Sequence, residues 1–184
     1  MNLKPQNLKK KVSVLVLSVA SVASIATSKG DYWQTCKNVS GPEISLEASE
    51  SSEKTVTLDY TTYYSDGVEQ SLEFDFVITA FTGNPTIELS LLSGEDEIIT
   101  SSTLNVTAES DYMFLQHSPE CLTPGESCSF EYTLRATTEG EGSVNIDWNG
   151  KFLMMYSNPQ YSDEGTDVIS LEIEGGNIEN NDCY

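Results

Sequence analysis

The fold is decided by Cys121-Leu-Thr-Pro-Gly-Glu-Ser-Cys128 and the run Ser129-Phe-Glu-Tyr-Thr-Leu134 that follows it at once. A Pro-Gly pair between two cysteines favours a tight turn, which brings the two sulfur atoms close together. The run after the turn alternates polar and apolar residues, as a strand with one wet and one buried face does. This stretch therefore predicts a disulfide-clipped β protein that works outside the reducing cytosol.

The N-terminus has the parts of a secretory signal peptide. Four lysines lie among the first eleven residues, and an apolar run of residues 12–26 follows them. Ser24 and Ala26 are small side chains at the positions that a signal peptidase reads, so we predict cleavage before Thr27, with a second site after Ala23. The run is shorter than the roughly 20 apolar residues of a spanning helix. We expect an extracytoplasmic protein (secreted, periplasmic or at the cell surface) with no membrane span after cleavage.

The chain is strongly acidic, with 29 acidic and 9 basic residues and a net charge of −20 at pH 7. Removal of residues 1–26 would leave five basic residues against all 29 acidic ones. Nucleic acid is excluded as a partner because phosphate binding needs a basic footprint. The acidic residues are spread along the whole chain, which favours a soluble surface over a dedicated cation site.

Four cysteines follow the predicted cleavage site, and an even number in an exported protein indicates disulfides. We predict one bond between Cys121 and Cys128, across the Pro-Gly turn. The second would join Cys36 to Cys183, and an intermolecular bond through either of these two is the alternative. Zinc is disfavoured because paired Cys-x-x-Cys spacings are absent and His117 is the single histidine.

The rest of the chain alternates in the pattern of half-buried strands, with Gly, Pro, Asn and Asp between the runs. Trp148 alternates in phase with Val144 and Ile146, which predicts a core position. Roughly eight to ten short strands of this kind predict an antiparallel sandwich of two sheets around one core. The expected strands are residues 43–48, 55–60, 71–78, 86–92, 104–108, 112–116, 128–136, 143–148, 152–156 and 168–174.

The turn Cys121–Cys128, the strand after it and the following Thr137-Thr-Glu-Gly140 resemble the ASH domain of ASPM, hydin and many exported bacterial proteins. The resemblance covers about residues 54–175 and departs from the family at Leu134-Arg-Ala136, where a Phe-x-Pro ending is usual. It implies an immunoglobulin-like sandwich that serves as a binding or structural module, with no catalytic residues to carry over. The expected organisation is a signal peptide (1–26), a lead segment (27–42), the sandwich (43–175) and a tail (176–184).

Candidate catalytic groups are sparse in this sequence. His117 has no accompanying nucleophile motif, and a general base needs an oriented partner. Glu73 and Asp75 flank Phe74 on the expected wet face of a strand, and paired carboxylates can hydrolyse glycosides. With 29 acidic residues such pairs arise by chance. We therefore predict no catalytic residue and no enzyme activity.

Binding candidates are the acidic loops and the tyrosines. Residues 94–97 and 162–167 offer oxygen ligands for calcium without a known calcium-loop spacing, so no metal or other cofactor is predicted and calcium is left open. Exposed aromatic rings stack on sugars or anchor protein partners. The candidate binding residues are Tyr60, Tyr63, Tyr64, Tyr156 and Tyr161.

Functions of several classes follow from these observations. The leading hypothesis is a non-catalytic exported module that binds a protein or a surface glycan. The first alternative is a structural subunit of a surface fibre or envelope layer, which would add strands at its sheet edges. Weaker alternatives are a carbohydrate-binding module and a secreted hydrolase.

Overall fold

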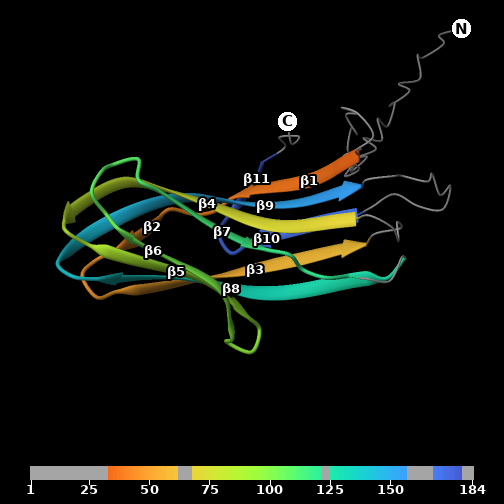
Figure 1. Ribbon diagram of the computed structural model, residues 1–184, viewed down its shortest axis with the longest axis horizontal. Coiled ribbons are helices and arrows are strands. Elements are labelled where there is room, and N and C mark those ends of the chain that lie inside the picture. Colours follow the sequence, from red (N-terminus) through yellow and green to blue (C-terminus); the bar gives the residue numbers. More distant parts are fainter. Residues whose placement is uncertain (1–32, 62–67, 122–124, 157–167, 180–184) are drawn as a thin grey trace, which may run out of the picture.

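The protein is a sandwich of two antiparallel sheets, as the computed structural model shows (Figure 1). The structure describes residues 33–61, 68–121, 125–156 and 168–179. All regular structure in these ranges is β, so the predicted all-β, two-sheet architecture is confirmed. The same ranges contain no helix long and apolar enough to cross a membrane.

The first sheet has the strand order β11-β1-β9-β4-β7, and β2 also pairs with β9; the second has the order β10-β3-β8-β5-β6. The strands of the first sheet are β1 (Trp33–Ser40), β2 (Ile44–Leu46), β4 (Val68–Gly83), β7 (Tyr112–His117), β9 (Gly142–Tyr156) and β11 (Asn177–Glu179). Those of the second are β3 (Ser51–Thr61), β5 (Thr86–Ser93), β6 (Ile98–Asn105), β8 (Ser127–Glu139) and β10 (Val168–Ile173).

The connectivity is that of one long hairpin rolled up on itself. Four antiparallel pairs, β5·β6, β4·β7, β3·β8 and β2·β9, nest around the turn that joins β5 to β6. The pairs β4·β9 and β5·β8 then join this hairpin to itself, one in each sheet. This is the order of a jelly roll. The sandwich is thus the predicted one, while its strand order differs from the ABED and CFG sheets of an immunoglobulin domain.

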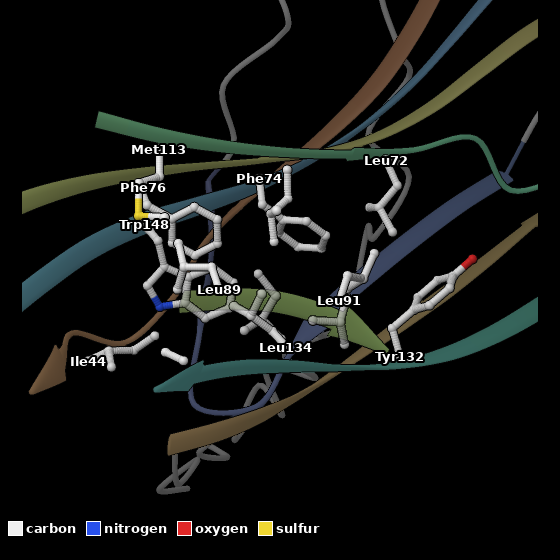
Figure 2. Close-up of a cluster of buried hydrophobic side chains, with 14 of the residues drawn as sticks. Ile44, Leu72, Phe74, Phe76, Leu89, Leu91, Met113, Tyr132, Leu134 and Trp148 are labelled. Carbon is white, nitrogen blue, oxygen red and sulfur yellow. The ribbon is translucent and has the colours of Figure 1, made fainter. Parts of the chain in front are cut away.

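The core lies between the two sheets, where alternate residues of the central strands point toward the other sheet (Figure 2). Trp148 is 2% exposed, which confirms its predicted core position. Its ring stacks on Phe76 at a centroid distance of 5.8 Å, and its Nε1 donates a hydrogen bond to the carbonyl oxygen of Pro42 at 2.8 Å. The hydrogen bond ties the link between β1 and β2 to the centre of the core.

The sandwich extends beyond residues 43–175 at both ends. The lead segment contributes β1, which pairs with β9 from Trp33 to Ser40, and the tail contributes β11, which pairs with the last three residues of β1. Neither strand has the apolar alternation by which the central strands can be found. Main-chain pairing holds them, and Val39 of β1 also reaches the core at 1% exposure, so pattern alone placed the boundaries too far inward.

The disulfide between Cys121 and Cys128 is confirmed, with its Cα atoms 6.0 Å apart. Cys36 also takes part in a disulfide. Its predicted partner Cys183 lies outside the described residues, so that pairing stays a prediction. The strand β11 ends four residues before Cys183 and pairs with β1 beside Cys36, which supports it.

Removing the Cys121–Cys128 bond should lower the free energy of unfolding by about 2–3 kcal/mol, the loop-closure value for a small loop. The double variant Cys121→Ser/Cys128→Ser, unfolded in urea, measures this effect without touching the disulfide of Cys36. Ser129→Ala is the matched control, because Ser129 is exposed on the same strand and should change stability by less than about 0.5 kcal/mol. An unchanged urea midpoint in the double variant would contradict the prediction.

Candidate functional site

Tyr60 is the one predicted binding residue whose side chain the structure describes, and its assignment was wrong. Tyr60 is 2% exposed and packs on Phe152 at a centroid distance of 4.8 Å. Its hydroxyl donates to Gln70 at 2.6 Å, and burial raises its pKa. The residue lies in phase with the buried Val56 and Leu58, so the alternation of β3 directs it into the core. The side chains of Tyr63, Tyr64, Tyr156 and Tyr161 lie outside the described part of the chain.

His117 packs as an end residue of β7. Its half-buried ring meets the ring of Tyr132 edge-on at a centroid distance of 5.5 Å, and burial lowers the pKa of its imidazole. The hydroxyl of Tyr132 is buried and has no hydrogen-bond partner among the described residues. An aromatic edge does not orient an imidazole as a carboxylate does, so this contact is a packing contact.

The exposed apolar surface gathers on the outer face of the first sheet, over β4 and β7. The described residues have four exposed large apolar side chains, and three of them lie here: Val77 at 38%, Tyr112 at 55% and Phe114 at 40%. Val77 lies directly opposite Tyr112 in the β4–β7 ladder, and Phe114 is the next outward residue of β7. We call these three residues the β4–β7 patch. They are cross-strand and same-face neighbours, so they form one continuous surface.

The strand β7 is apolar on both faces, and this sets it apart from its neighbours. Met113 and Leu115 point into the core, at 4% and 1% exposure, while Tyr112 and Phe114 point outward. Sequence reasoning predicted the strand and missed these two outward aromatic residues. The available signal was the phase of the alternation: in Tyr112-Met-Phe-Leu-Gln116, both phases contain large apolar side chains.

Carboxylates border the patch on β4. The hydroxyl of Tyr112 donates a hydrogen bond to Asp75. This bond, with desolvation and the negative charges of Asp75 and Glu73, raises the pKa of Tyr112 to about 12. Asp147 of β9 lies opposite Val77 on the same face and is exposed. The patch is therefore an aromatic and aliphatic surface in a negative setting.

A row of polar contacts crosses the sheet beside the patch. Gln116 Nε2 donates to Ser71 Oγ at 2.8 Å, and Ser71 Oγ donates to Glu73 Oε1 at 2.9 Å. Lys151 Nζ lies 3.6 Å from Glu73 Oε2. The two carboxylates that suggested glycoside hydrolysis thus lie on the outer face and have separate partners, Tyr112 for Asp75 and Ser71 with Lys151 for Glu73. Both carboxylates accept hydrogen bonds from their neighbours, Glu73 from Ser71 and Asp75 from Tyr112.

The acidic loop at residues 94–97, which the structure describes, adds no metal site. Over the residues that the structure describes, no group of three or more His, Cys, Asp or Glu side chains is arranged to hold a metal ion. Residues 94–97 form the turn between β5 and β6. The other acidic loop, residues 162–167, lies outside the described ranges. The chemistry available at the β4–β7 patch is contact with apolar groups, together with hydrogen bonding to acidic oxygens.

The comparisons with known proteins identify no family. No family model and no curated protein matches the chain. Among solved structures, the chain is similar to dimeric latent PorU from Porphyromonas gingivalis, at 18% identity and a TM-score of 0.37, over 73% of this chain and 14% of that one. It is also similar to a mutant VP2 protein of infectious bursal disease virus in T=1 particles, at 10% identity and a TM-score of 0.35, over 88% of this chain and 40% of that one. The chain thus spans less than half of either protein, and the resemblance to the ASH domain stays a prediction.

Proposed function

We propose that this chain is a non-catalytic, extracytoplasmic module that binds a protein partner through the β4–β7 patch. The observation that carries the proposal is the cluster of Tyr112, Phe114 and Val77 on the outer face of a sheet. Aromatic side chains are enriched in the centres of protein interfaces, where a few of them supply most of the affinity. The confirmed disulfide supports a location outside the reducing cytosol.

The scaffold of the patch favours binding because it is already ordered. The residues that alternate with the patch on β4 and β7 are core residues, among them Phe76 and Met113, so both strands are held from their inner side. The hydrogen bond to Asp75 further restrains the ring of Tyr112. A surface that is rigid before binding loses less conformational entropy when a partner docks.

Removing both aromatic rings should strongly weaken partner binding while leaving the fold intact. The mature chain and its Tyr112→Ser/Phe114→Ser variant would be screened side by side against a displayed peptide library and a glycan array. Peptides selected by the unaltered chain should bind the variant at least about 30-fold more weakly, the equivalent of one hot spot of about 2 kcal/mol. Because both rings are exposed, the urea midpoint of the variant should stay close to that of the unaltered chain.

The matched control is Ile98→Ser, which removes an equally exposed apolar side chain from β6, in the other sheet. This control should bind the selected peptides with unchanged affinity. Ligands that bind the double variant as well as the unaltered chain would overturn the proposal. Glycans that bind only through the patch would replace it with a carbohydrate-binding function.

A further inference from the structure

The strand that bears Tyr112 and Phe114 is also an edge of its sheet. Among the strands that the structure describes, β7 ends the first sheet and has β4 as its one sheet neighbour. In an antiparallel pair the backbone N–H and C=O groups of a strand alternate between the two sides. Half of these groups in an edge strand therefore point away from the sheet and can pair with another chain. The patch and a row of pairing groups thus belong to the same strand.

The edge at β7 lacks the features that protect sheet edges. Natural edges are blunted by short strands, charged side chains, prolines or bulges. The other edge strands that the structure describes have such features: β2 and β11 are three residues long, β10 contains Glu172, and the β5–β6 ladder is irregular between Leu91 and Leu92. In contrast, Tyr112-Met-Phe-Leu-Gln-His117 has no acidic or basic residue except one neutral histidine, and its ladder with β4 runs without a register shift.

The patch lies where it would contact the side chains of an added strand. Directly opposite residues of paired strands have Cβ atoms about 4.5–5.5 Å apart. A strand that paired with β7 would therefore place alternate side chains beside Tyr112 and Phe114, on the same outer face. Main-chain hydrogen bonds would supply affinity and the patch would supply selectivity, which is the division of roles in known strand addition.

Charge limits which strand can be added. The carboxylates of Asp75, Glu73 and Asp147 lie on the same face as the patch, and the whole chain has a net charge of −20. A second copy of this chain would bring the same charges to the contact, and like charges across an interface are unfavourable. Lysine or arginine side chains on the outer face of the added strand would complement this surface, because their cationic heads can pair with the carboxylates while their methylene stems lie on the rings of Tyr112 and Phe114.

We infer that an extended, basic segment of another protein, in which cationic and apolar residues alternate, pairs with the free edge of β7 as an additional strand. This inference rests on the proposed function, since it specifies how the partner uses the β4–β7 patch. It also specifies the ligand class: a peptide in β conformation with Lys or Arg at every second position.

The test uses a nine-residue peptide of alternating valine and lysine, with the mature chain that contains both disulfides. Two N-methylated versions are compared, one for each set of alternate amides. Only the version whose methyl groups face β7 should lose binding, by at least 10-fold, because that edge alone pairs with the protein; the other should stay within about 3-fold. A peptide of the same composition with all lysines before all valines, the control for plain charge attraction, should bind at least 10-fold more weakly. Added NaCl should weaken binding of the alternating peptide.

Hydrogen exchange locates the bound peptide independently. Bound peptide should slow exchange at alternate amides of Tyr112–His117, with no comparable change in β6 or β10. If both N-methylated versions bind equally while Tyr112→Ser/Phe114→Ser abolishes binding, strand addition is overturned and the proposed function stands. If, in that variant, one N-methylated version still loses binding and the other does not, strand addition occurs away from the patch and the proposed function fails. The inference of a basic partner would be wrong if the alternating peptide did not bind. It would also be wrong if the amides of β7 were protected from exchange by concentration-dependent self-association instead.

Discussion

Trp148→Ala is expected to lower the free energy of unfolding by about 3–5 kcal/mol, the usual range for removal of a large buried aromatic ring. The ring is 2% exposed and contacts Phe74 and Phe76, at centroid distances of 6.1 and 5.8 Å. Its loss leaves a cavity in the first sheet's inner face and a carbonyl oxygen of Pro42 without its donor. Urea unfolding followed by circular dichroism measures the difference.

Trp148→Phe separates the two contributions. Phenylalanine keeps an aromatic ring against Phe76 and removes the Nε1 donor, so its cost should be less than half that of alanine. A hydrogen bond contributes about 0.5–1.5 kcal/mol net, and the remainder of the loss is packing. Equal destabilisation by the two substitutions would show that the bond to Pro42 dominates, contrary to this expectation. A loss below about 1 kcal/mol for alanine would contradict the core position itself.

Gly142→Ala is expected to destabilise the protein by roughly 3 kcal/mol or more, because strain at a disallowed backbone conformation alone costs about 1–3 kcal/mol. Gly142 has φ +129°, where residues with side chains rarely lie, and a Cβ atom there would lie 1.9 Å from the carbonyl oxygen of Thr82. The neighbour is backbone, so no side-chain rotation relieves the contact. The strands β4 and β9 would separate at the pair Gly83 and Gly142, where their ladder ends.

Gly94→Ala is the matched control for that substitution. A Cβ atom at Gly94 would lie 3.8 Å from the carbonyl oxygen of Glu131, which is ordinary van der Waals contact. Its effect on the urea midpoint should stay within about 0.5 kcal/mol. If both alanine variants unfold at the same urea concentration, the steric argument for Gly142 is wrong.

The phase of alternation was the reliable part of the sequence signal. It placed Trp148 in the core correctly, because a period of two fixes which face a residue belongs to. The alternation also indicates that Tyr60 is buried, because Tyr60 shares its face of β3 with Leu58. That residue was assigned to a binding site because other tyrosines follow it closely in the sequence. Phase is a statement about local geometry, whereas proximity in sequence says little about exposure.

The order of the strands was beyond sequence reasoning. The pairing of residues such as Thr55 and Thr133 depends on the topology of the whole jelly roll. The alternation within one strand is compatible with many neighbouring strands. The disulfide turn could be predicted because its two ends are seven residues apart. Recognition of the β4–β7 patch needed both kinds of information: the outward phase of Tyr112 is local, while the edge position of β7 is a property of the topology.

The nested hairpin also dictates the order in which the chain can reach its native state. The turn between β5 and β6 closes a short loop, whereas Leu46 of β2 must find Val144 of β9, almost the whole domain away in sequence. Contacts of such long range slow folding, since the entropy of closing the loop is lost before the contact is gained. On a ribosome, which releases the N-terminus first, β2 and β3 emerge long before their partners exist. Their apolar faces stay uncovered until the last third of the polypeptide, which begins just before β8, has been made.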